Sequence, residues 1–308
     1  MGAQCRSRSR LFGMGRRLRY EFTVTEAADR HSHAHSMDGH VLGQIGLHWP
    51  EEGDPCGEGL HLHISPLLLE PDGHIDFGVL GVFLDMAGSQ ASQSRPFVHA
   101  DISIQRIARP RGEKVFINAR ALRAGKRTSI VQVEAFDELG TRIADSTQQI
   151  SYRTLDGVEA EAASGRSAEI RRQFRASFDG ECKLAGRLHD IIGLSEGTAE
   201  DGSPYWTMPS GEASQNGFGG LHGGVAFDLV TDAAVGGASR QLGPVRANGA
   251  LLRYLAPASV GPFRAVPIVM VEDDEVAFVR VEVFDDGQDA KLCIVGEVHV
   301  AVLRDPVT

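Results

Sequence analysis

The 308-residue sequence has little that is typical of a membrane protein, a secreted protein or a nucleic-acid-binding protein. No apolar run approaches the length of about 18 residues that a membrane-spanning helix needs. The net charge of -10 argues against nucleic-acid binding, because neutralising phosphates requires clustered lysine and arginine. The four cysteines, Cys5, Cys56, Cys182 and Cys293, are far apart and lack metal-ligand spacing, so we expect reduced thiols, no metal and a cytoplasmic protein.

The first 39 residues read as a flexible leader that is basic and then histidine-rich. Arginines crowd residues 6 to 19, and the first acidic residue is Glu21. No apolar segment follows them, so the pattern does not predict a signal peptide. Four histidines come next, at His31, His33, His35 and His40. Alternating histidines can bind a transition metal, but in so polar a stretch we expect a mobile surface segment.

The most informative stretch runs from Gly211 to Ser239, GEASQNGFGGLHGGVAFDLVTDAAVGGAS. Glycines break its first half, and from Gly224 onward apolar residues recur at three- and four-residue spacing. These residues are Val225, Ala226, Leu229, Val230, Ala233 and Ala234. The spacing predicts one buried helix of roughly 15 residues that follows a tight loop.

His222-Gly223-Gly224 is therefore expected at the junction of loop and helix. The first turn of a helix carries unpaired N–H groups and the positive end of the helix dipole, and glycines let a substrate oxygen approach them. Asn216 could supply a further donor to a developing oxyanion, and losing one such donor typically costs about 3 to 4 kcal/mol of barrier. The alternative is that the glycines only allow close packing and that His222 fills a hole.

An internal repeat divides the chain. The string Asp101 to Pro110 returns as Asn248 to Pro257, an offset of 248 − 101 = 147, and Val131 to Asp137 returns as Val279 to Asp285, an offset of 148. The triplet Ile45-Gly46-Leu47 likewise returns as Ile192-Gly193-Leu194. The repeat predicts two similar domains, over 40–154 and 187–304, joined by a linker over 155–186.

Each domain shows the same order of elements: a short strand, a loop, one apolar helix and then several strands. In the first domain the helix is expected over 79–91 and the strands over 115–122, 129–136 and 143–152. In the second domain the later strands are expected over 264–271, 276–284 and 292–303. A single helix followed by a strand meander predicts an α+β fold in which an antiparallel sheet wraps around that helix.

At this point the chain resembles the hotdog-fold acyl-CoA thioesterases of the phenylacetate and 4-hydroxybenzoate type. The resemblance rests on the N-x5-H-G-G pattern before the helix and on the strand Leu251-Leu-Arg-Tyr-Leu-Ala-Pro257, and it covers both halves. It implies two tandem hotdog domains. Its motif separates thioesterases from dehydratases better than the fold pattern does.

The resemblance also implies where the site lies. In this family one unit supplies Asn and the HGG amides, here Asn216, His222 and Gly223, and the other supplies an acidic residue on its helix. Aligning Gly78 with Gly224 puts Asp85 at that acidic position in the first domain. One composite site is therefore expected, and the reciprocal site, which carries Glu70, Asp76 and Thr231, is expected to be inactive. In an ungapped alignment Asp85 corresponds to Asp232, which stays a reserve candidate.

The implied reaction is hydrolysis of an acyl-CoA thioester without a cofactor. The carbonyl oxygen would accept a hydrogen bond from the Gly223 N–H, and Gly224 would also contact the substrate. Asp85 would attack the carbonyl carbon or activate water. Burial on an apolar helix is expected to raise the pKa of Asp85, although a purely structural role in the core is the alternative. The acyl pocket is expected to include Phe83 and Phe227. His99, also a candidate to bind the substrate, or Ser103 is expected to assist Asp85. Candidates to bind the CoA phosphates are Arg109, Arg111, Lys114, Lys126 and Arg127.

Two other functions stay open. A non-catalytic acyl-CoA-binding or sensor protein would bind without turnover, and a hotdog hydratase or dehydratase would need a differently placed acid and histidine. We expect a homodimer, because exposed sheet edges tend to pair, and no nucleic-acid or membrane partner.

Overall fold

The computed structural model describes residues 39–49, 60–90, 97–152, 178–216, 219–271 and 273–303. All of them fall within one unit, Ser36–Thr308. Cys5, Cys56, most of the leader and most of the expected linker lie outside these ranges. No helix among the described residues is long and apolar enough to span a membrane.

The N-terminal half has one long helix followed by four strands. Its elements are α1 (Val41–Gln44), β1 (Leu47–His48), β2 (His61–His63), the 3-10 helix η2 (Pro66–Leu68), α2 (Phe77–Gln90), β3 (Phe97–Arg106), β4 (Lys114–Ala124), β5 (Thr128–Asp137) and β6 (Arg142–Tyr152). Burial alternates strictly along β5, from buried Ser129 to buried Asp137. Alternate residues of a strand point to opposite faces, so one face of this sheet meets the core.

The C-terminal half repeats this order. Its elements are α4 (Leu188–Ile191), β7 (Ser195–Thr198), β8 (Pro204–Met208), α5 (Val225–Leu242), β9 (Val245–Tyr254), β10 (Phe263–Val271), β11 (Val276–Asp285), the 3-10 helix η3 (Asp286–Gln288) and β12 (Lys291–Val302). Gly46 and Gly193, which hold equivalent places after α1 and α4, both adopt positive φ, at 83° and 69°. Glycine tolerates this conformation because it has no Cβ.

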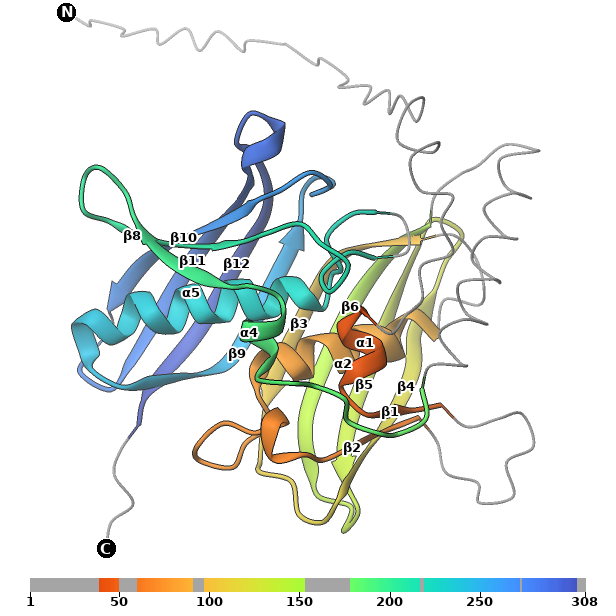
Figure 1. Ribbon diagram of the computed structural model, residues 1–308. Helices are drawn as coiled ribbons and strands as arrows, with labels where there is room; N and C mark the ends of the chain where they lie inside the picture. Colours follow the sequence, from red (N-terminus) through yellow and green to blue (C-terminus); the bar gives the residue numbers. More distant parts are fainter. Residues whose placement is uncertain are drawn as a thin grey trace, which may run out of the picture. The chain divides into compact units, whose positions relative to one another are not determined.

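The strands join into a single antiparallel sheet in the order β1-β2-β4-β5-β6-β3-β9-β12-β11-β10-β8-β7 (Figure 1). The halves meet where β3 pairs with β9, with Ser103 opposite Leu251 and Ile104 opposite Ala250. By the offset of 147, Leu251 is the counterpart of Ile104 and Ala250 is the counterpart of Ser103. The pairing is therefore symmetric about the middle of these two strands.

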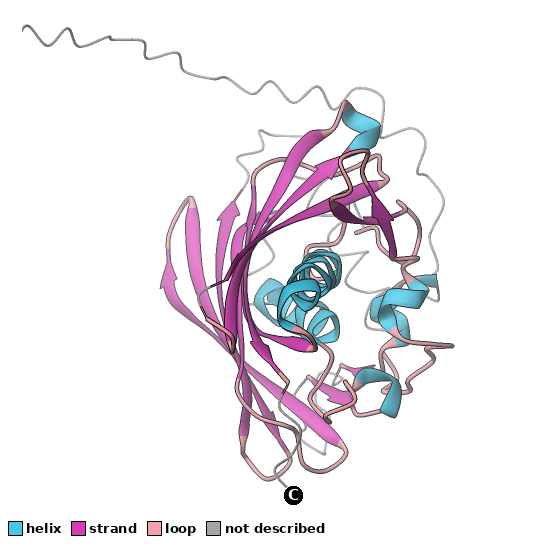
Figure 2. Ribbon diagram, turned by 90° about the vertical axis from the view of Figure 1, so that its left-hand side faces the viewer, coloured by secondary structure: helices cyan, strands magenta, loops and turns pink. Residues whose placement is uncertain are grey.

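Both long helices lie against one face of the curved sheet (Figure 2). Helix α2 packs on β3 to β6, helix α5 packs on β8 to β12, and the helices contact each other. Phe83 and Phe227, one from each helix, have no exposed surface. Burying side chains of this size stabilises the fold by about 1.5 to 3 kcal/mol each.

The predicted helices and strands agree with the structure to within a few residues at their ends. The largest difference is α5, which ends at Leu242, beyond the expected stretch, where Gly243 takes a positive φ of 78°. The end of the expected linker is hydrogen-bonded to the N-terminal half: Gly180 N–H donates to the Leu47 carbonyl at 2.9 Å. The expectation that His40 lies on a mobile surface is wrong: its imidazole is 5 % exposed and accepts a hydrogen bond from Leu42 N–H.

Candidate functional site

The start of α5 lies directly against the middle of α2. A Cβ atom on Gly224 would lie 2.6 Å from the Val82 Cα and 2.8 Å from the Gly81 carbonyl oxygen. Because both are backbone atoms, they could not move aside for a side chain. Glycine at 224 therefore allows the close crossing that brings the first turn of α5 to Asp85.

Asp85 is the centre of a buried polar cluster made by both halves of the chain. Its Oδ2 accepts a hydrogen bond of 2.9 Å from Gly224 N–H, and its Oδ1 lies 3.0 Å from Nδ1 of His99 on β3. His222 Nδ1 lies 3.4 Å from Oδ2. Asp85 itself is 6 % exposed. The helix dipole of α5 favours a negative charge at this place.

The pKa of Asp85 is lower than the sequence alone predicts. Burial raises the pKa, as expected, but His99, His222 and the Gly224 N–H outweigh that effect and hold it at about 2. The expectation of a raised pKa is therefore wrong, because it counted desolvation without the groups that other segments bring to the carboxylate. Asp85 is ionised at neutral pH.

His222 is a neutral imidazole in this cluster. Burial lowers its pKa, Asp85 raises it, and His99 lowers it again, with a net decrease. Gly224 N–H also approaches His222 Nδ1, at 3.1 Å. His40 packs edge-on against His222 with ring centroids 5.4 Å apart, and its pKa is lowered to about 3, chiefly by burial.

Two residues of the cluster were not predicted. Gln148 on β6 is fully buried, and its Oε1 lies 3.1 Å from His99 Nε2 while its amide donates to the Leu84 carbonyl. Tyr254, at the end of β9, donates from its hydroxyl to the Gly223 carbonyl at 2.8 Å. A glutamine at an inward-facing position of an alternating strand is a signal that could have found Gln148. The Tyr254 contact needed the tertiary structure.

Several predicted residues have other surroundings. Asn216 donates from its amide to the Leu221 carbonyl and accepts from Gly220 N–H, so its side chain braces the loop before His222. Phe83 and Phe227 lie in the core. Ser103 is outside the cluster, since its hydroxyl donates to the Thr147 carbonyl in an exposed position.

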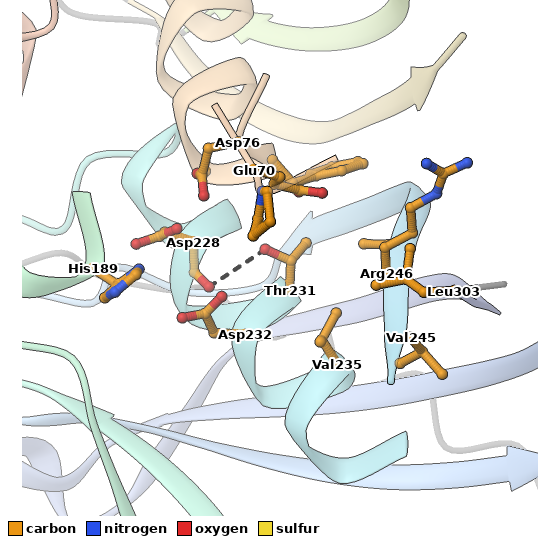
Figure 3. A pocket seen from close by; sticks show the side chains of 14 residues that line it. Glu70, Asp76, His189, Asp228, Thr231, Asp232, Val235, Val245, Arg246 and Leu303 are labelled. Carbon is orange, nitrogen blue, oxygen red and sulfur yellow. Dashed lines mark hydrogen bonds between the residues drawn. The ribbon is translucent and has the colours of Figure 1, made fainter. Parts of the chain in front are cut away.

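The reciprocal position holds a cavity of about 220 Å³ (Figure 3). Glu70, Asp76 and Thr231, which the sequence assigned to the reciprocal site, line it together with Asp228 and Asp232. Thr231 donates to the Phe227 carbonyl within its own helix. The reserve candidate Asp232 therefore lies in this cavity.

The contacts between α2 and α5 support the alignment of Gly78 with Gly224, which put Asp85 at the acidic position of the site. Gly224 meets Val82, while a Cβ on Gly78 would lie within 2.6 Å of the Asp228 Cβ. Both pairs fit one offset, since 224 − 78 = 146 and 228 − 82 = 146. The same offset relates Asp85 to Thr231. The helices are thus shifted by one residue from the offset of 147 that relates β3 and β9.

The basic residues that are candidates to bind the CoA phosphates lie at two opposite ends of the strands. His99 is opposite Ile150, and Ile150 is opposite Ser129, so the hairpin with Lys126 and Arg127 is at the His99 end. The remaining three basic candidates, Arg109, Arg111 and Lys114, lie at or before the start of β4, at the other end. A β-bulge between His99 and Asp101 interrupts the ladder beside the cluster.

Comparisons with known proteins agree on the fold. No protein-family model and no curated protein sequence matches the chain. A TesB protein from Mycobacterium avium subspecies paratuberculosis superposes with a TM-score of 0.56 at 10 % identity, covering 88 % of this chain and 100 % of that one. A hotdog-fold protein of unknown function from Alicyclobacillus acidocaldarius has a TM-score of 0.55 at 13 % identity, covering 87 % and 99 %. An acyl-ACP thioesterase from Bacteroides thetaiotaomicron has a TM-score of 0.50 at 13 % identity, covering 78 % and 96 %.

The chain therefore has a hotdog-like fold, a mainly antiparallel sheet with few helices. Within this fold, the cluster around Asp85 combines an ionised carboxylate, a helix N-terminus, neutral His222 and the Tyr254 hydroxyl. This combination can bind a polarised carbonyl and move a proton next to it.

Proposed function

We propose that the protein is a thioester hydrolase that cleaves an acyl-CoA at one composite site between two tandem hotdog repeats. The single observation that supports this most is the hydrogen bond from Gly224 N–H to the Asp85 carboxylate, which joins the acid of one repeat to the amide loop of the other. The proposed domains remain 40–154 and 187–304. The thioesterases among the structures of similar fold are consistent with the proposal.

The Gly223 N–H is the proposed donor to the thioester carbonyl. Within the described residues it has no hydrogen-bond partner, and it stands at the positive end of α5. A side chain on Gly223 would lie 3.3 Å from both Asp85 Oδ2 and the Tyr254 hydroxyl. The carboxylate is thus close enough to act on a carbonyl held at this amide, and such a donor is worth about 3 kcal/mol of barrier.

Two routes lead from this geometry to products. In the first, Asp85 takes a proton from water, the water oxygen bonds to the carbonyl carbon, and the C–S bond breaks. The CoA thiolate then takes up the proton. In the second, an Asp85 oxygen attacks the carbonyl carbon and the C–S bond breaks to release the thiolate. Water then cleaves the resulting anhydride to the free acid and the Asp85 carboxylate, and one proton of the water passes to the thiolate. Both routes require the ionised carboxylate that the low pKa provides.

The CoA phosphates are proposed to bind near Lys126 and Arg127. These residues follow β4 at the His99 end of the sheet, whereas Arg109, Arg111 and Lys114 are at the other end. Acyl specificity is proposed to depend on segments next to Phe83 and Phe227 rather than on these buried rings themselves.

A thiol-release assay over acyl-CoA esters of different length tests the proposal. Asp85→Asn is expected to reduce kcat by about 10² to 10⁴-fold, the usual contribution of a general base. Asp201→Asn, a change of the same kind at an exposed hairpin residue, is the matched control and should keep full activity. Unchanged turnover in a folded Asp85→Asn protein would defeat the assignment. Binding of acyl-CoA by the wild-type protein without turnover would instead favour a sensor.

A hydratase or dehydratase is the second candidate, favoured by the two imidazoles, His99 and His222, that flank Asp85. Addition of water to an enoyl-CoA needs an acid and a base side by side, and this cluster contains such groups. Loss of the enoyl-CoA absorbance without thiol release would identify this activity.

A homodimer remains a prediction for the assembly. The outermost strands of the described sheet, β1 and β7, have only two and four residues, so they offer little edge backbone for pairing between copies. Sedimentation at micromolar concentration should give twice the 33.2 kDa chain mass, and a monomer would reject the prediction.

A further inference from the structure

The reciprocal cavity has a carboxyl-rich end and an apolar end. The carboxyl groups of Asp76, Asp228 and Asp232 gather beside His189, while Val235, Val245 and Leu303 lie farther along the wall (Figure 3). Its volume of about 220 Å³ admits a group of several heavy atoms, since liquid water occupies about 30 Å³ per molecule.

The cations close to this cavity are already paired. Arg106 forms an ion pair with Glu70 and also donates to the Ile75 and Ala247 carbonyls. Arg246 forms an ion pair with Asp72 and contacts His74. In the part of the chain that the structure describes, no lysine or arginine pairs with Asp76, Asp228 or Asp232. Within those residues, Asp228 and Asp232 therefore have no cationic partner, whereas Asp76 feels the charges of His189 and Arg106 without forming an ion pair.

Asp228 provides a second, independent observation. It is 1 % exposed, and its Oδ2 has no hydrogen-bond partner among the described residues. Buried polar atoms nearly always have a partner, so an orphaned oxygen in a cavity wall points to a group that is bound there. Such a group must donate a hydrogen bond, and the neighbouring carboxyl groups favour one with positive charge.

We propose that this cavity binds a small organic cation with a primary ammonium group and a short hydrocarbon tail. The ammonium donates to Asp228 and Asp232, since its three N–H donors match carboxyl acceptors, and the tail lies against Val235, Val245 and Leu303. A metal ion fits less well, because no three histidine, cysteine or acidic side chains within the described ranges are grouped as metal ligands would be.

Ammonium binding is linked to protons at this site. Burial, with Asp76 and other carboxyl groups adding to it, raises the pKa of Asp228 well above its usual range and that of Asp232 to about 7. Glu70 and Asp76 face these groups from before α2, His189 faces them from α4, and Arg246 faces them from β9. A bound ammonium stabilises the ionised carboxylate, so binding releases a proton. Affinity therefore rises with pH, by up to tenfold per pH unit below about pH 7.

Isothermal titration with n-butylammonium chloride at pH 8 tests the proposal, with 1-butanol as the neutral ligand of similar shape. Wild-type protein is expected to bind the ammonium at least tenfold more tightly than the alcohol. Asp228→Asn should weaken ammonium binding at least tenfold, and the exposed control Asp201→Asn should leave it unchanged. Circular dichroism checks that each variant is folded.

The pH series on the wild-type protein does not depend on any variant. Equal affinity at pH 6 and pH 8, equal binding of the alcohol, or full binding by folded Asp228→Asn would each overturn the proposal. Tighter binding of Mg²⁺ or Ca²⁺ than of butylammonium would also overturn it. Thioester hydrolysis, measured on the same samples, separates a failure here from a failure of the proposed activity.

Discussion

The two long helices begin in matching positions but in opposite electrostatic surroundings. At the start of α5, Gly224 N–H meets the Asp85 carboxylate, which comes from the other helix. At the start of α2, Asp76 corresponds to His222 by the offset of 146. The Asp76 Oδ1 accepts a hydrogen bond from Val79 N–H, in its own helix, at 3.2 Å. An aspartate that caps its own helix already uses the positive end of the dipole. Asp228, which lies against Gly78, therefore finds a negative neighbour there instead of an open N–H.

The titration of the two sites follows from this difference. Asp85 has a lowered pKa and Asp228 has a raised one, although burial raises the pKa of both. What differs is the partner: imidazoles and an amide surround Asp85, whereas Asp232 and Asp76 surround Asp228. Asp76 stands where the HGG motif has its histidine, and together with Asp232 it makes this position one that repels anions. Three pairs of substitutions sharpen or break this comparison.

The largest expected effect is on the helix crossing. Gly224→Ala should lower the free energy of unfolding by about 3 kcal/mol, because the new methyl group collides with the α2 backbone. Gly78→Ala should cost somewhat less, about 2 kcal/mol, because the Asp228 carboxyl group can rotate away although its Cβ, 2.6 Å from the new methyl group, cannot. Urea unfolding measures both changes. A smaller loss in Gly224→Ala than in Gly78→Ala would show that the two crossings are not related as described.

The same charge-removing change should act with opposite signs at the two sites. At pH 7, Asp85→Asn is expected to destabilise the protein by about 2 kcal/mol, since the lowered pKa is worth about 1.4 kcal/mol per unit. That stability is present above about pH 4 and is lost as the pH falls toward about 2. Asp228→Asn is expected to stabilise by about 1 kcal/mol at pH 8, because it removes a repelled carboxyl group.

The gain from Asp228→Asn should shrink toward pH 5. A carboxyl group with a raised pKa keeps its proton in the folded state, so the native protein loses stability as pH rises from about 4 toward neutrality. The amide cannot titrate and escapes this loss. Thermal unfolding between pH 5 and pH 8 measures the effect. A destabilised Asp228→Asn protein at pH 8 would contradict the comparison.

The smallest expected effect concerns a hydroxyl that only one site has. Tyr254 hydrogen-bonds to the Gly223 carbonyl, and its counterpart by the offset of 147 is Ile107. Tyr254→Phe should cost about 1 kcal/mol of stability and reduce thioester turnover a few-fold. Tyr152→Phe also removes one hydroxyl hydrogen bond, to Ser129, and should leave turnover unchanged. Equal turnover in both variants would contradict a role for Tyr254 in the reaction.

Much of the fold could be predicted because similar strings occur in both halves of the sequence, so that each half could be aligned with the other. The repeated strings around Asp101 and Asn248, with the alternation in β5 and β11, set the order of elements and the start of α5. His40 was misjudged because its neighbours in sequence are polar, whereas its burial depends on His222, which is far away along the chain. Gln148 was missed for the same kind of reason, since its partners lie on α2 and β3.

The amino-acid sequence by itself determined the elements, the repeated strings and the residue types at both helix starts, because periodicity and glycine placement are local properties of the chain. Only the tertiary structure decided the charge states. The pKa of Asp85 or Asp228 depends on which groups the other half of the molecule brings within hydrogen-bonding distance, and that juxtaposition arises only when the two helices cross.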